Sequence, residues 1–150
     1  MRKFEEQKYQ DFLADFNLFI CETFGYRNAV YYNEINEEPT FVAHEREFDI
    51  YIRLREDGMQ EYPDNTIILV RTSFSARNGR QDKERQLSNF EKLLRFFIAY
   101  APQYGFNTIA FDGLGVDNFT DKTEYGFKPK AINSYQATPI TMLTIPESTK

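Results

Sequence analysis

The sequence predicts an α/β protein with a mixed β-sheet. Three observations support this: a long amphipathic segment near the N-terminus, alternating apolar segments in the first half, and an apolar strand, a helix and another apolar strand in succession after residue 66. Strand, helix and strand in this order are typical of a right-handed crossover between parallel strands. With 150 residues and neither an internal repeat nor a linker, the chain is expected to form one domain over residues 1–150.

The first expected element is a helix over residues 3–24. Its apolar residues recur at spacings of three and four, which is the period of an amphipathic helix. Gly25 follows the last of them, where a left-handed residue commonly ends a helix. The aromatic stripe is expected to face the core rather than a partner. Its members are Phe4, Tyr9, Phe12, Leu13, Phe16, Phe19, Ile20, Thr23 and Phe24.

Three strands are expected before the second helix, over residues 29–35, 48–55 and 66–74. Residues 48–55 ("FDIYIRLR") alternate strictly between apolar and polar, as in a half-buried strand. Residues 66–74 ("TIILVRTSF") open with a continuous apolar run, as in a central strand covered on both faces. The turn-rich segment between these two strands predicts that they pair antiparallel.

A second long helix is expected to begin between Asp82 and Ser88 and to run to about Gln103. A strand over residues 107–116 should then lie parallel to residues 66–74. The C-terminal third is expected to form a short helix around residues 118–125, followed by strands over 130–137 and 139–145.

Composition narrows the function. The net charge of −5 argues against general duplex binding, since phosphate neutralisation needs a basic face, and we expect no nucleic-acid partner. One Cys and one His cannot build an ordinary zinc site. Because no apolar run approaches membrane-spanning length and the N-terminus is too polar for a signal peptide, we expect a cytoplasmic protein with no membrane partner.

Two local motifs carry a family resemblance. The first is an apolar strand, a cationic loop and a long helix ("TIILVRTSF", "SARNGRQDKERQ", "LSNFEKLLRFFIAYAPQYGF"); the second is "EYGFKPKA". With the order of elements, they make the chain from about residue 29 onward resemble the GNAT superfamily of acetyl-coenzyme A-dependent N-acetyltransferases. The resemblance implies a GNAT-like mixed sheet in which the central strand and its parallel neighbour splay apart.

The resemblance also implies where acetyl-CoA would bind. Backbone N–H groups of the central strand would bind the pantetheine arm, at Ser73, Phe74 and Ser75. The pyrophosphate would lie at the N-terminus of the second helix, where free N–H groups and the helix dipole favour an anion. The residues that this implies within the loop over 80–89 are Arg80, Arg85, Ser88 and Asn89.

For catalysis, the resemblance implies a tyrosine that protonates the leaving thiolate and a carboxylate that deprotonates the amine. Tyr125, beside Gly126, is the candidate acid, with simple packing beside the Gly-Phe turn as the alternative. Asp112 or Glu47 could be the base. The implied activity is direct acetyl transfer to an amine of a small molecule or a protein.

Other interpretations remain open. The cationic loop can be a solvated connection without a ligand. Ser88 and Phe90 stand where the family's loop has small residues, and Lys122 stands where many members carry the tyrosine. These residues also fit a catalytically inactive binding or regulatory module. A further alternative is an unrelated aromatic-rich α/β protein that works as a homodimer.

Overall fold

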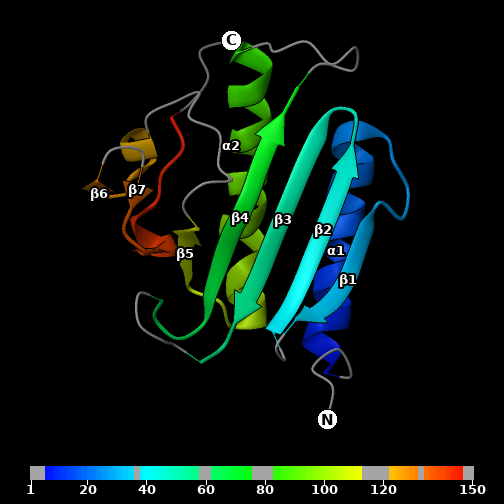
Figure 1. Cartoon of the computed structure of the whole chain (residues 1–150), viewed down its shortest axis with the longest axis horizontal. Coiled ribbons are helices and arrows are strands. Elements are labelled where there is room, and N and C mark those ends of the chain that lie inside the picture. Colours follow the sequence, from blue (N-terminus) through cyan, green and yellow to red (C-terminus); the bar gives the residue numbers. More distant parts are fainter. Residues whose placement is uncertain are drawn as a thin grey trace.

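The computed structural model describes residues 6–35, 38–57, 62–75, 83–112, 122–131 and 134–146. Within these ranges it contains a six-stranded sheet in the order β1-β2-β3-β4-β5-β8 (Figure 1). Strands β1 to β4 are antiparallel neighbours, β4 and β5 run parallel, and β8 is antiparallel to β5. The chain is therefore α/β with a mixed sheet, as the sequence predicts. The sheet strands are β1 (Val30–Ile35), β2 (Glu38–Glu45), β3 (Phe48–Arg55), β4 (Thr66–Phe74), β5 (Thr108–Phe111) and β8 (Thr138–Pro139).

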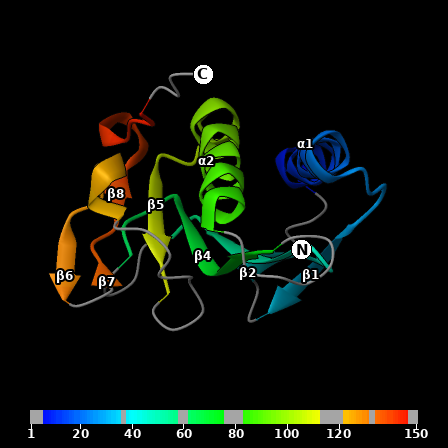
Figure 2. The same cartoon turned by 90° about the horizontal axis from the view of Figure 1, so that it is seen from above.

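Both long helices pack on the same face of the sheet (Figure 2). These are α1 (Gln7–Phe24) and α2 (Lys83–Tyr100), the latter continuing into a 3-10 turn, η2 (Ala101–Tyr104). Residues 3–5 of the helix expected over 3–24 lie outside the described residues, and the described helix begins at Gln7. Helix α1 ends as expected, because Gly25 is left-handed and its N–H donates to Cys21 O at 2.8 Å. Pro102 lies in η2, so the α-helical part of the second helix ends slightly earlier than expected.

The core between helices and sheet is largely aromatic. The Phe96 ring of α2 lies 5.0 Å from Phe19, 5.6 Å from Phe16 and 6.1 Å from Phe12, all on α1. Phe12 in turn reaches the sheet, where its centroid is 4.9 Å from that of Phe41 on β2. Phe4 of the predicted helical stripe lies outside the described residues. The described aromatic residues of the stripe face the core, because they fill the space between two helices and one sheet face.

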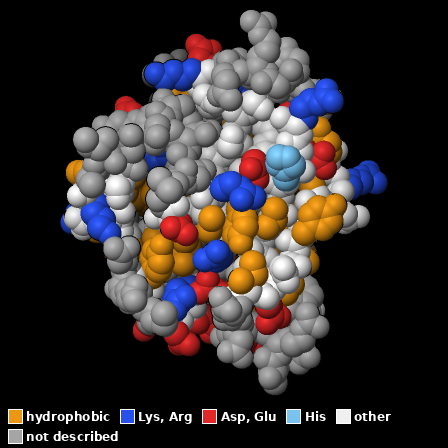
Figure 3. Space-filling view, in the orientation of Figure 1, with side chains coloured by type: hydrophobic (Ala, Val, Ile, Leu, Met, Phe, Trp, Pro, Cys, Tyr) orange, Lys and Arg blue, Asp and Glu red, His pale blue; other side chains and the backbone are white. Residues whose placement is uncertain are grey.

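Strand β3 confirms the alternation. Phe48, Ile50, Ile52 and Leu54 are buried, while the residues between them are half-buried on the opposite face. That opposite face has neither helix over it and presents apolar, cationic and acidic side chains together (Figure 3). The antiparallel pairing of β3 with β4 and the parallel pairing of β4 with β5 are both confirmed.

The strand β2 was not expected. Its residues pair with both β1 and β3, although its second residue is a proline and it carries Thr40, His44 and other polar side chains. Pro39 is tolerated because it pairs with Glu34 of β1 near the end of that ladder.

The C-terminal region corrects two expectations. Residues 130–137 do not form one strand; within the described part they form a hairpin of β6 (Pro129–Ala131) with β7 (Ser134–Tyr135). Residues 139–145 are mostly not a strand either, because only Thr138–Pro139 pairs with β5 and a 3-10 turn, η5 (Ile140–Met142), follows. Ile140 and Leu143 are buried while residues 141 and 142 are exposed, a spacing of three that suits this turn.

Another 3-10 turn, η4 (Lys122–Tyr125), occupies the described part of the short helix expected around residues 118–125. Residues 118–121 lie outside the described residues, as do residues 113–116 of the strand expected over 107–116. The described strand β5 ends at Phe111.

Candidate functional site

The C-terminal part of β4 extends beyond its pairing with β5. The parallel ladder joins Thr66–Leu69 to Thr108–Phe111, and its last bond runs from the Asp112 N–H to Leu69 O at 2.9 Å. Strand β4 continues to Phe74. We call the side of Val70–Phe74 that points away from β3 the distal β4 edge. Among the described residues, no strand pairs with this edge.

A β-bulge sets the direction of the amides along the distal β4 edge. On β3, Tyr51 pairs with Arg71 and Ile52 with Leu69, so Val70 is the additional residue. Beyond the bulge, the Ser75 N–H donates to Glu47 O at 2.9 Å. Because N–H groups alternate in direction along an antiparallel strand, Ser73 also faces β3, whereas Thr72 and Phe74 direct their N–H groups to the distal β4 edge.

The three amides implied for pantetheine binding therefore separate into two groups. Phe74 directs its N–H to the distal β4 edge, while its ring is buried and stacks on Phe24 at 6.2 Å. Ser73 faces β3 through its backbone. Ser75 uses both of its donors inside the fold, because its hydroxyl donates to Arg46 O at 2.9 Å. Thr72, which sequence reasoning missed, supplies the second outward amide.

Thr72 adds an unusual side chain at this place. It is fully buried on the helix-covered face, opposite Ile50, and its Oγ1 has no hydrogen-bond partner in the described part of the chain. A buried hydroxyl without a partner costs free energy comparable to a lost hydrogen bond. A polar ligand along the distal β4 edge could satisfy it.

Helix α2 already includes Lys83, so residues 83–89 are helix rather than loop. Ser88 and Asn89 lie in its second turn, where their N–H groups bond to the preceding turn and cannot face a phosphate. Of the two side chains, that of Ser88 is exposed and that of Asn89 is buried. Arg85 is exposed in the first turn, and Arg80 lies outside the described residues.

Lys122 lies beside the C-terminal end of β5. It is 1% exposed, and its Nζ lies 5.4 Å from the ring centroid of Phe90 on α2 and 5.9 Å from that of Phe111. Aromatic faces partly offset the cost of burying a cation. The bulky Phe90 points into this core and is 1% exposed, so its side chain does not occupy the surface at the start of α2.

Tyr125 lies on the helix-covered side of the sheet. It is 1% exposed, and its hydroxyl donates to Glu91 Oε2 on α2 at 2.8 Å. Burial, and then the hydrogen bond and negative charge of Glu91, raise the pKa of Tyr125 well above its usual value. A raised pKa makes the phenol a weaker acid, and its proton is directed at Glu91.

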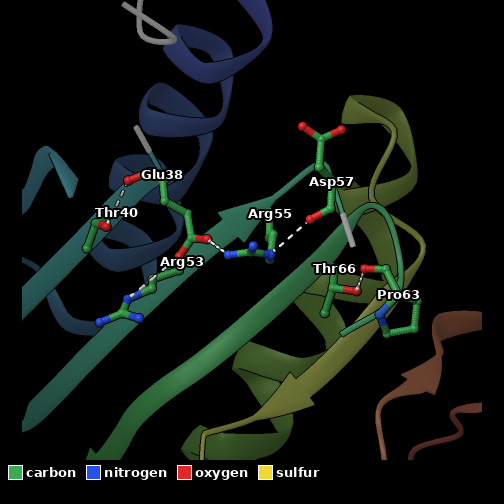
Figure 4. Close-up of polar contacts among 7 residues, drawn as sticks. All are labelled: Glu38, Thr40, Arg53, Arg55, Asp57, Pro63 and Thr66. Atoms are coloured by element: carbon green, nitrogen blue, oxygen red, sulfur yellow. Dashed lines mark hydrogen bonds and ion pairs between the residues drawn. The ribbon is translucent and has the colours of Figure 1, made fainter. Parts of the chain in front are cut away.

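Asp112 lies on the opposite face. It is exposed directly after β5, and its charge contributes to the raised pKa of Arg53, after the hydrogen bond to Tyr51 and the charges of Tyr51 and Glu38. Arg53 belongs to the helix-free face of β3, where the Glu38 carboxylate lies between Arg53 and Arg55 (Figure 4). The two predicted catalytic residues, Asp112 and Tyr125, are therefore on different faces of the sheet.

Glu47, the alternative base, is buried and forms hydrogen bonds within the fold. It is 6% exposed, and its Oε1 accepts a hydrogen bond from the Tyr26 hydroxyl at 2.5 Å. Its main-chain oxygen accepts the Ser75 N–H. Glu47 thus ties the loop after α1 to the start of β3 and the end of β4, which is a structural role.

No cluster of three or more His, Cys, Asp or Glu side chains that could hold a metal ion occurs among the described residues. In the same part of the chain, neither helix combines the length and apolarity needed to cross a membrane.

The chain matches no protein-family model, no curated protein and no solved structure.

Proposed function

We propose that the chain is an acetyl-CoA-dependent N-acetyltransferase that transfers the acetyl group directly to an amine. The observation that carries the proposal is the distal β4 edge: a strand that outruns its parallel partner, with the Thr72 and Phe74 amides directed outward and the Thr72 hydroxyl buried beside them. An extended amide-containing chain binds such an edge as an additional strand would. The pantetheine arm of coenzyme A is a chain of this kind.

The residues around the distal β4 edge suit the rest of coenzyme A. Helix α2 follows β4 in the chain, and its first turn carries the exposed cations Lys83 and Arg85. The N-terminal turn of a helix favours an anion through its free N–H groups and its dipole. Pyrophosphate would be held there, while Thr72 and Phe74 would hold the pantetheine arm.

In the proposed reaction, the amine nitrogen forms a bond to the acetyl carbon and the bond from that carbon to sulfur breaks. Asp112, exposed on the helix-free face, would accept the amine proton directly or through water. Outward N–H groups of β4 would polarise the thioester carbonyl. Coenzyme A would leave as the thiolate, and Tyr125, whose proton is directed at Glu91, is no longer our candidate acid.

A specific observation favours a second candidate function, a coenzyme A-binding module without turnover. Tyr125 donates to Glu91 and is buried, so no tyrosine of η4 is available to protonate the thiolate. In that case the distal β4 edge would still bind the ligand. Binding and turnover must therefore be measured separately.

Thermal unfolding with acetyl-CoA tests binding. A ligand present at about 100 times its dissociation constant stabilises the native state by about 2.7 kcal/mol, which for a domain of this size raises Tm by roughly 5–10 °C. Acetate and adenosine diphosphate are the matched controls, since each lacks the pantetheine arm. An unchanged Tm at saturating acetyl-CoA would refute both candidate functions.

Release of free coenzyme A thiol, measured with a panel of primary amines, tests turnover. An N-acetyltransferase gives thiol and acetylated amine in equal amounts, and Asp112→Asn lowers the rate without lowering the Tm rise. A raised Tm with no thiol release for any amine would instead support the binding module.

A further inference from the structure

A groove lies between α1 and α2 and is lined by side chains of both helices. The two helices lie side by side on the same face of the sheet (Figure 2). The groove encloses about 240 Å³, and its apolar lining includes Phe19, Phe96 and Tyr100. The Phe96 ring stacks on Phe19 and on Tyr100, in each case with 5.0 Å between ring centroids. Leu18 lines the same groove and is 51% exposed, although it is an aliphatic side chain in the middle of a helix. This surface is apolar where a solvated helix pair would be polar.

The two walls of the groove carry opposite charges. Helix α1 contributes Asp15 and Glu22, whereas α2 contributes Lys92 and Arg95. Within the described part of the chain, none of these four side chains forms an ion pair. Partial burial and the neighbouring charge of Asp11 raise the pKa of Asp15, as expected for a carboxylate with no cation beside it.

We propose that a second copy of this chain covers the groove, forming a two-fold dimer through the α1 and α2 faces. Charge complementarity selects this occupant. In a two-fold dimer whose axis runs parallel to the helices, α1 of each copy faces α2 of the other, so the acidic wall meets the basic wall twice. An axis across the helices would instead set α1 against α1 and bring like charges together.

The positions of the charged residues along the helices agree with a two-fold axis parallel to the helices. Helices α1 and α2 run in opposite directions (Figure 1). The rings of Phe19 and Phe96 stack and so lie at the same height along the two helices. Glu22 follows Phe19 in α1 by about one turn, and Lys92 precedes Phe96 in α2 by about one turn. Because the helices are antiparallel, Glu22 and Lys92 lie at the same height. An axis parallel to the helices preserves height, so Glu22 of one copy would face Lys92 of the other.

The outer face of α1 and α2 is large enough for a dimer interface. Each helix has 18 residues, which gives a length of about 27 Å, and two adjacent helices present a face about 20 Å wide. This face of about 540 Å² is slightly larger than the roughly 500 Å² per partner that a specific interface needs. Leu18 would lie near the centre of the interface, and the charged walls would form its rim.

Charge reversal tests the dimer. We expect the wild-type chain to have a mass of twice 17.8 kDa in sedimentation equilibrium at roughly 100 µM, a concentration well above the dissociation constants usual for interfaces of this size. E22K and K92E each place like charges opposite each other at both symmetric contacts. Each variant alone should therefore dimerise at least about tenfold more weakly.

The decisive sample is an equimolar mixture of E22K and K92E. In a mixed dimer, the substituted residues of the two variants face each other, and the unchanged Lys92 and Glu22 face each other as well. Opposite charges then meet at both contacts, so mixing should restore the dimer. A pairing of Glu22 with Lys92 inside one chain would give no such recovery.

Three outcomes would overturn the proposal: a monomeric wild type, variants that dimerise as tightly as the wild type, or a mixture that remains monomeric. A monomeric wild type would indicate a different partner for the groove. Glu22 and Lys92 are both exposed, so the substitutions should leave the fold intact, and circular dichroism checks this. Leu18→Asp should also give a monomer, and Ile35→Asp, at an exposed apolar position of β1, is its matched control.

Discussion

Substituting Gly126 by alanine should destabilise the protein strongly. Gly126 joins η4 to Phe127 at φ +106°, a backbone conformation that residues with a side chain rarely adopt. A Cβ atom there would lie 2.4 Å from the main-chain oxygen of Met142. The carbonyl cannot turn away at low cost, because the neighbouring Thr144 N–H bonds to Tyr125 O at 3.0 Å and holds the two segments together.

The expected loss in the free energy of unfolding is the sum of two costs. Backbone strain at this φ and displacement of the Met142 carbonyl each cost about 1–3 kcal/mol, so the variant should lose roughly 2–6 kcal/mol. At roughly 2–4 °C per kcal/mol for a domain of this size, Tm should fall by about 4–24 °C. That is a large share of the roughly 5–15 kcal/mol that stabilises a typical domain.

Urea unfolding followed by circular dichroism measures the loss, and Gly105→Ala is the matched control. Gly105 has a similar φ of +87°, but an added Cβ would meet no atom within 4 Å. It should therefore lose only the strain. If the two variants proved equally stable, the close approach of η4 to the C-terminal segment would play no part in stability, and the reasoning would be wrong.

Three further predictions follow from the same contacts. Phe96→Ala should cost about 3–5 kcal/mol in urea unfolding, since its ring joins both helices, and a loss under 1 kcal/mol would contradict this packing. Because the pKa of Tyr125 is raised in the native state, the free energy of unfolding should fall above pH 10, where the unfolded tyrosine ionises and the native one does not. Tyr125→Phe should make that fall shallower by up to about 1.4 kcal/mol per pH unit. An unchanged slope would contradict this prediction. Arg85→Glu should weaken acetyl-CoA binding at least about tenfold in calorimetry, whereas Arg27→Glu, an exposed charge before β1, should leave it unchanged; equal losses would point to net charge rather than to a phosphate site.

The sequence alone predicts elements whose periodicity follows from one packing requirement. Helix α1 covers one sheet face, and β3 has one face buried, so each shows a single clear pattern. Residues 38–45 show no such pattern because one face of β2 is polar and Pro39 resembles a turn signal. Residues 139–145 are as apolar as a strand, yet pairing with β5 stops at Pro139, because its partner Thr108 is the first residue of β5.

The candidate site depends on features that no local pattern encodes. Which β4 amides point outward is set by the bulge at Val70 and the pairing of Ser75 with Glu47, two contacts between distant segments. The sequence therefore directs attention to the end of β4 but cannot separate the outward amides of Thr72 and Phe74 from those of Ser73 and Ser75. Knowledge of the β3–β4 register would have been the missing signal.

Amide hydrogen exchange at Ser73, Ser75, Thr72 and Phe74, followed by NMR with and without coenzyme A, tests the central claim most directly. In the free protein, Ser73 and Ser75 should be protected by β3, while Thr72 and Phe74 exchange much faster. Coenzyme A should then slow exchange at Thr72 and Phe74 alone. If all four amides were already protected in the free protein, or if coenzyme A left Thr72 and Phe74 unchanged, the distal β4 edge would not be the binding site.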